Sequence, residues 1–181
     1  MNNRVVRAMY RAFKNRGFST LRFNFRGVGR SQGHYDNGQG ELSDAASALD
    51  WLQLHNSSAA GCWVGGFSFG AWIGMQLLMR RPEISHFVSV APPASTSDFS
   101  FLAPLPSPGL IVHGGDDEVV PEAVVAKLAH KLSTQRTIKV AYHVITGANH
   151  SFDNRHEDLH TTIDSYIDNQ AVDRPLIAAL A

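Results

Sequence analysis

Residues 65–72, GGFSFGAW, place a single serine between two glycines. Ser68 has Gly66 two positions before it and Gly70 two positions after it. A serine hydroxyl can attack a carbonyl carbon when a neighbouring base removes its proton. Glycines on both sides permit a sharp turn that would push the hydroxyl outward. The stretch therefore predicts a nucleophile, which needs a base and an acid from elsewhere in the chain.

Two later segments offer these groups. GDDEVVP (115–121) carries Asp116 and Asp117, and TGANHSFD (146–153) carries His150. A histidine can take the serine proton near neutral pH, and a carboxylate can orient the imidazole. The order serine, acid, histidine is typical of G-x-S-x-G hydrolases and differs from chymotrypsin-like and subtilisin-like proteases. We expect Ser68 to be the nucleophile, His150 the base and Asp117 the acid, with Asp116 as the alternative acid.

Helical and extended patterns alternate along the chain. We expect helices over 4–16, 41–55, 69–80 and 121–134 and a last one marked by Leu159, Ile163 and Ile167; the expected strands are 19–25, 62–67, 84–93, 109–114 and, as the last strand, 137–145. This alternation predicts a mostly parallel sheet covered on both faces, a three-layer α/β/α sandwich. We expect one domain over residues 1–181 with no lid domain. Ser68 would then lie between a strand and a helix, and the backbone N–H of Phe69 would be one donor to an oxyanion.

Several motifs taken together resemble those of a known superfamily. They are RFNFRGVGRSQG (22–33), GFSFG (66–70), VHGGDDEVVP (112–121) and GANH (147–150). The combination resembles the α/β-hydrolase superfamily, and more narrowly the small lidless bacterial hydrolases related to dienelactone hydrolases and acyl-peptidase-type esterases. In that family the acid sits in the pattern H-G-x-x-D-x-x-V-P, which falls on Asp117 here. The resemblance implies a serine esterase that works through an acyl-enzyme, and we expect no cofactor and no metal.

The start of the chain departs from this family pattern. The family fold normally begins with about three strands before the helix expected at 4–16. The third would lie between strands 19–25 and 62–67, and the loop after it carries the second oxyanion donor. Without it we expect a gap in the sheet, since buried backbone groups rarely stay unpaired. Met1 would then be an internal start of a longer protein; alternatively the two strands close up, or a neighbouring chain fills the gap.

This departure bears on the expected activity. Loss of one oxyanion donor lowers turnover on the order of a hundred- to a thousandfold. The first alternative to an active esterase is therefore a catalytically impaired α/β-hydrolase-fold protein with a binding or oligomeric role. A second alternative is an amidase or peptidase that uses the same three residues.

Composition restricts the partners and the compartment. Lys plus Arg and Asp plus Glu are both 16, so the net charge is zero, which argues against nucleic acid or an anionic membrane as the main partner. With one cysteine the chain forms no internal disulfide, and no secretory signal or long apolar run is evident. We expect a cytoplasmic protein that acts on a small-molecule ester, and a homodimer remains open.

Aromatic residues near the nucleophile are candidates for a substrate pocket. Phe67, Phe69 and Trp72 flank Ser68 and either line an acyl pocket or pack in the core. The segment 92–108 is too short for a lid domain and offers a further wall of an open site: Phe99, Phe101 and Leu102.

The remaining histidines and the cysteine suggest no second chemistry. We expect a structural role for His113, at a strand end beside the acid, and an inert buried thiol for Cys62. His156 and His160 stand four residues apart on one helix, and we interpret them as part of an exposed polar face.

Overall fold

The computed structural model describes residues 3–135, 138–170 and 176–180. Its strands, all paired in parallel in one sheet, are β1 (Ser19–Arg22), β2 (Gly61–Phe67), β3 (Ile84–Val90), β4 (Gly109–Gly114), β5 (Val140–Ile145) and β6 (Leu176–Leu180). Its helices are α1 (Arg4–Lys14), α2 (Gln39–Leu54), α3 (Phe69–Leu78), α4 (Glu122–Ser133) and α5 (His156–Gln170). The spatial order of the strands is β1-β6-β2-β3-β4-β5.

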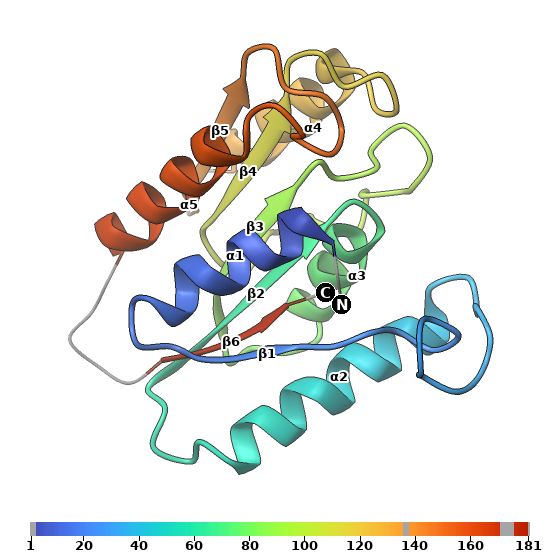
Figure 1. Ribbon diagram of the computed structural model, residues 1–181, viewed down its shortest axis with the longest axis vertical. Coiled ribbons are helices and arrows are strands. Elements are labelled where there is room, and N and C mark those ends of the chain that lie inside the picture. The colour runs from blue at the N-terminus through green and yellow to red at the C-terminus, as the bar shows by residue number, and fades with distance from the viewer. Residues whose placement is uncertain (1–2, 136–137, 171–175, 181) are drawn as a thin grey trace.

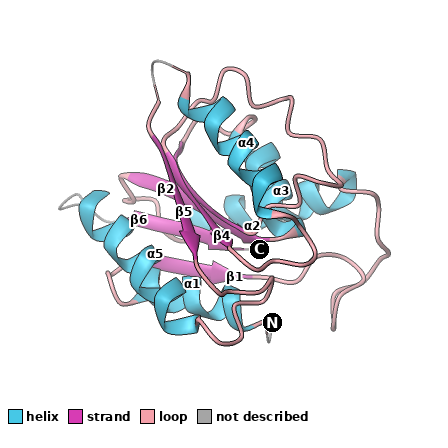
Figure 2. Cartoon of the chain, turned by 90° about the horizontal axis from the view of Figure 1, so that it is seen from above, coloured by secondary structure: helices cyan, strands magenta, loops and turns pink. Residues whose placement is uncertain are grey.

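The helices cover both faces of the sheet (Figures 1 and 2). Helices α1 and α5 lie side by side on one face, where Val5, Met9 and Phe13 of α1 are buried together with Ile163 of α5. Helices α2, α3 and α4 cover the opposite face. Apolar residues at helical spacing bury one stripe of each helix against the sheet. The predicted three-layer α/β/α fold is confirmed.

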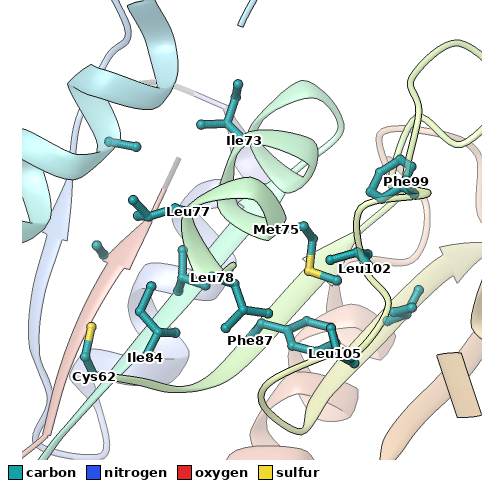
Figure 3. Close-up of a cluster of buried hydrophobic side chains, with 14 of the residues drawn as sticks. Cys62, Ile73, Met75, Leu77, Leu78, Ile84, Phe87, Phe99, Leu102 and Leu105 are labelled. Atoms are coloured by element: carbon teal, nitrogen blue, oxygen red, sulfur yellow. The ribbon is translucent and has the colours of Figure 1, made fainter. Parts of the chain in front are cut away.

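The core on the α2–α3–α4 face includes the segment between β3 and β4. Figure 3 shows Phe99, Leu102 and Leu105 of this segment beside Met75 and Phe87. Through these side chains the segment packs onto α3 and the sheet.

Element boundaries differ from the predicted ones mainly at strand ends. Strand β1 ends at Arg22, although the alternating pattern continued to residue 25. Strand β3 ends at Val90, ahead of Pro92 and Pro93, which have no N–H to donate to a neighbouring strand. Strand β5 begins at Val140, and residue 137 of the predicted strand lies outside the described residues.

Strand β6 corrects the prediction of a gap in the sheet and of 137–145 as the last strand. It lies between β1 and β2 (Figure 1), with Ala178 opposite Thr20 on one side and Trp63 on the other. Strands β1 and β2 therefore do not pair directly, and the ladder between them is made by this same chain. The run LIAAL is too short for its periodicity to separate a strand from a helix, which is why the sequence did not predict it.

No helix within the described ranges has both the length and the apolar character that crossing a membrane requires.

Candidate active site

Ser68 sits at the sharp turn between β2 and α3 in a conformation that is rare for a residue with a side chain. Its φ is 50° and its ψ is −118°, in the positive-φ region that non-glycine residues occupy with strain. The Ser68 N–H donates to the carbonyl of Val90 at 2.9 Å, which fixes the turn to the end of β3. The turn leaves the serine at the carboxyl edge of the sheet and at the start of α3, as the sequence predicted.

Gly66 makes this turn possible because the backbone of α3 passes directly over it. A Cβ atom at position 66 would lie 2.3 Å from the carbonyl carbon and oxygen of Gly70. Backbone atoms cannot move aside as a flexible side chain can, so any side chain here would push α3 away from β2. Glycine at position 66 is therefore needed for the close approach of strand and helix.

We expect the substitution Gly66→Ala to lower the free energy of unfolding by about 3 kcal/mol, as overpacking against rigid backbone does. The matched control is Gly74→Ala on α3, where the new Cβ would lie 3.3 Å from the movable Val64 Cγ2. Urea unfolding of both variants measures the difference. A Gly66→Ala midpoint no lower than that of Gly74→Ala would contradict this account of the turn.

The structure brings Ser68, His150 and Asp117 together from three loops. Ser68 Oγ lies 3.1 Å from His150 Nε2, and His150 Nδ1 lies 2.7 Å from Asp117 Oδ2. All three follow strands whose carboxyl ends lie at one edge of the sheet, namely β2, β4 and β5. The imidazole is also flanked by Phe67, with ring centroids 5.1 Å apart.

The hydrogen bonds of Asp117 determine the tautomer of His150. An ionised carboxylate only accepts hydrogen bonds, so the proton on the imidazole must be on Nδ1, facing Asp117. Nε2 then carries a lone pair and accepts the hydroxyl proton of Ser68. This arrangement leaves the imidazole ready to act as a base toward the serine.

Asp117 is held more firmly than its neighbour Asp116. The Asp117 side chain is fully buried, and its Oδ1 accepts the N–H groups of Val119 at 2.9 Å and Val120 at 2.8 Å. Asp116 is exposed, and its backbone N–H donates to the carbonyl of Ala148. Of the two aspartates, Asp117 is therefore the one in contact with His150.

His113 lies behind Asp117 and does not contact Ser68. Its side chain is fully buried, its Nε2–H donates to the Val120 carbonyl at 2.9 Å, and the same nitrogen is 3.5 Å from Asp117 Oδ2. Burial lowers the pKa of His113, so the imidazole is neutral at physiological pH. The contact with Val120 ties the end of β4 to the turn that carries Asp117, which is the structural role expected of His113.

The first turn of α3 supplies backbone N–H groups beside Ser68. Phe69 is the first residue of this helix, and N–H groups in a first turn have no partner within the helix. The positive end of the helix dipole also favours negative charge at this position. Phe69 N–H is therefore located where the sequence analysis expected an oxyanion donor.

A small apolar cavity of about 190 Å³ lies beside the turn that carries Ser68 and is lined by the residues on either side of it, Phe67 and Phe69. Phe23 and Phe25, from the chain just after β1, also line it. Of the residues that the sequence offered for a pocket, Phe67 and Phe69 lie here. Phe99 and Leu102 are instead buried in the core on the α2–α3–α4 face (Figure 3), and Phe101 packs against Phe99 with ring centroids 6.1 Å apart.

Other residues of the cavity wall were not predicted as site residues. They are Asn3 at the start of α1, together with Arg22, Asn24 and Val28. Three of them belong to RFNFRGVG (22–29), a motif that carried the family resemblance, so the signal was present without an assigned role. Tyr35, which lies shortly after this motif in the chain, packs edge-on against Phe69, with ring centroids 5.8 Å apart.

Cys62 lies apart from these groups, at the start of β2. Its thiol is buried and free, and burial raises its pKa to about 12. A protonated, inaccessible thiol is a poor nucleophile, so Cys62 has no part in the chemistry at Ser68.

Residues 2–102, more than half of the chain, match the family described as X-Pro dipeptidyl-peptidase (S15 family). The chain belongs to this S15 family of α/β hydrolases. The S15-family chain is 50% identical over 171 residues to an uncharacterised protein of Rickettsia prowazekii, covering 92% of this chain and 72% of that protein.

Solved structures similar to this S15-family chain have the same fold. A protein of unknown function from Agrobacterium tumefaciens is 55% identical, with a TM-score of 0.92 over 94% of this chain and 78% of that one. A lidless α/β serine hydrolase from Xanthomonas campestris is 30% identical, with a TM-score of 0.85 over 97% of this chain and 77% of that one. The expected resemblance to lidless α/β hydrolases is confirmed.

Proposed function

We propose that this chain is a serine hydrolase that cleaves small carboxylic esters through a covalent acyl-enzyme. The observation that carries the proposal is the continuous contact from Ser68 Oγ through His150 to Asp117, at 3.1 Å and 2.7 Å. A neutral serine is a weak nucleophile, and such a chain of contacts is what activates it.

The proposal assigns each step of the reaction to one group of the site. Ser68 Oγ attacks the ester carbonyl carbon while its proton passes to His150 Nε2, and Phe69 N–H donates to the oxyanion. The imidazolium, stabilised by Asp117, then protonates the departing alcohol as the carbon–oxygen bond breaks. Water attacks the acyl-enzyme with His150 again as the base, which releases the acid and restores Ser68.

The dimensions of the cavity favour a small acyl group. At about 190 Å³, it is below the range of about 300–1,000 Å³ typical of pockets for drug-sized ligands. Its phenylalanine side chains offer an apolar surface to an acyl chain. The segment between β3 and β4 is too short for a lid domain and buries Phe99, Leu102 and Leu105 in the core, which supports an open site.

Peptide cleavage is the second candidate, favoured by the family description of X-Pro dipeptidyl-peptidases. The same three residues can open an amide, whose leaving amine must also be protonated by the imidazolium. A free peptide amino terminus is positively charged, so a carboxylate near the nucleophile is the side chain that would bind it. Among the described residues that line the cavity beside Ser68, none is acidic. This favours the ester over the dipeptide.

A substrate panel tests the proposal directly. The purified chain is assayed with p-nitrophenyl acetate, butyrate and octanoate and with a glycyl-proline p-nitroanilide. We expect turnover of the acetate and butyrate to exceed that of both other substrates. Faster cleavage of the anilide would establish the peptidase. No turnover combined with no labelling by a fluorophosphonate probe would establish the catalytically silent protein.

We expect the substitution Asp117→Asn to lower kcat for p-nitrophenyl acetate on the order of 10⁴-fold, the magnitude seen for this change in a serine protease. An asparagine would keep its oxygen toward the N–H groups of Val119 and Val120 and turn its NH₂ toward His150. That donor would favour the tautomer with the proton on Nε2, which cannot accept from Ser68. Steady-state kinetics measure this loss of kcat, with Asp116→Asn as the matched control. An equal loss of kcat in both variants would contradict the assignment of Asp117 as the acid.

A further inference from the structure

A basic groove of about 410 Å³ lies between α1 and α5, outside the cavity beside Ser68. Helix α1 contributes Arg4, Arg7, Ala8 and Arg11 to its walls, and α5 contributes His156, Glu157 and His160. The two helices lie next to each other on the same face of the sheet (Figure 1). The groove has a volume suited to a small ligand.

The arginines project from α1 on the side away from the core. Positions 4, 7 and 11 fall on one face of a helix, whereas Val5, Met9 and other core residues of α1 point toward the sheet. Arg4, Arg7 and Arg11 are all exposed. The small side chain of Ala8 between them leaves room above the helix.

Among the described residues, these three arginines have no acidic partner, unlike Arg16, Arg26 and Arg81. Arg16, Arg26 and Arg81 each form ion pairs with two carboxylates. Within residues 3–135, 138–170 and 176–180, no carboxylate forms an ion pair with Arg4, Arg7 or Arg11. Although the chain as a whole has no net charge, this groove contains three guanidinium groups and one carboxylate, that of Glu157.

The opposite wall contains a buried nitrogen that has no hydrogen-bond partner in the part of the chain that the structure describes. His156 Nε2 is inaccessible to solvent and unpaired, whereas His160 Nδ1 contacts Asp164 Oδ2 at 2.9 Å. Both histidines are half-buried, and not exposed as the sequence suggested. Unpaired buried polar atoms are rare in folded proteins. Because solvent does not reach this nitrogen, a ligand in the groove contacts it only after a neighbouring side chain moves.

We propose that the groove binds a small soluble molecule that carries one or more phosphate groups. Arginine presents a planar fork of donors that matches phosphate oxygens in pairs, and three arginines line this groove. The start of α5 at His156 adds the positive end of a helix dipole, which also favours a phosphate. Glu157 opposes the negative charge of the ligand, so it gives the proposal a residue whose removal should strengthen binding.

Calorimetric titration of the full chain with inorganic pyrophosphate tests this proposal. We expect saturable binding that Arg7→Gln weakens about tenfold or more, since the variant loses a charge-assisted contact. Glu157→Gln should tighten binding about threefold, because it removes a repulsive charge. The matched control Arg80→Gln, at an exposed arginine just after α3, should change the affinity less than about twofold.

Three further results would overturn the proposal. If sulfate binds as tightly as pyrophosphate, or Arg7→Gln leaves the affinity unchanged, the groove holds an adventitious ion only. If the chain instead sediments with phosphatidylglycerol vesicles in an Arg7-dependent manner without binding pyrophosphate, the groove recognises lipid headgroups. Thermal melts of each variant establish that the exposed substitutions leave the fold intact. None of these measurements depends on ester hydrolysis. Phosphate binding in the groove can therefore be disproved while the proposed esterase function stands, and the esterase function can be disproved while phosphate binding stands.

Discussion

Replacing Ser68 with alanine is expected to lower kcat for p-nitrophenyl acetate on the order of 10⁴-fold or more, because the reaction loses its covalent route. Ser68 is the only group in contact with His150 Nε2 among the interactions of the described residues, so no second nucleophile can replace it. Alanine keeps the backbone turn and removes one oxygen atom, so we expect the fold to be kept. The melting temperature of the variant is measured alongside, and an unchanged value shows that the lost activity does not come from lost folding.

The measurement compares kcat of the wild-type chain, Ser68→Ala and Ser133→Ala in the same buffer. Ser133 is an exposed serine at the end of α4, and its hydroxyl donates only to the carbonyl of His130. We expect this control to hydrolyse at the wild-type rate. Fluorophosphonate labelling adds a second readout, since the probe forms a bond to the nucleophile itself. Equal hydrolysis by wild type and Ser68→Ala would show that any turnover arises away from this serine.

The site was predictable because each of its residues follows a strand of a parallel sheet. The carboxyl ends of such strands meet at one edge, so Ser68, Asp117 and His150 could be placed together from local patterns alone. The choice of Asp117 over Asp116 came from the family pattern, and the burial of Asp117 agrees with it. The sharp turn at Ser68 could also be foreseen, because only glycine at position 66 lets the backbone of α3 pass so close to β2.

The pocket and the sixth strand were not predictable from local patterns. Segment 92–108 has no helical or strand periodicity, so nothing in it indicates whether Phe99 and Leu102 face solvent or the core. Strand β6 depends on pairing with β1 and β2, which lie far away in the sequence. Whether a short apolar run forms a strand or a helix depends on such long-range contacts, which local sequence patterns do not show.

Strand β6 leads to the second large expected effect: Ala178→Asp should prevent stable folding. Ala178 is fully buried between β1 and β2, and its neighbours along β6 are buried on the two faces of the sheet, Ile177 and Ala179 on one, Leu180 on the other. An aspartate here would bury an unpaired charge, at a cost of several kcal/mol. Since a domain is stable by about 5–15 kcal/mol in total, much of that stability would be lost.

Urea unfolding followed by circular dichroism measures this effect, with Ala123→Asp as the matched control. Ala123 is exposed on α4, so the same change should shift its stability by less than about 0.5 kcal/mol. If Ala178→Asp yields no soluble protein, Ile177→Ala replaces it, and the cavity it leaves should cost about 2–4 kcal/mol. Trp63 lies opposite Ala178 on β2, so its fluorescence reports directly on this part of the sheet.

The same strand also supports the turn that holds the proposed nucleophile. Leu180 at the end of β6 pairs with Gly65, and a Cβ at position 65 would lie 2.7 Å from Leu180 Cδ2, so the leucine packs directly on β2 three residues before Ser68. Loss of β6 should therefore lower hydrolysis as well as stability. A chain carrying Ala178→Asp that unfolds at the control midpoint would mean that β1 and β2 are held together without β6, and the packing beneath Ser68 would need another source.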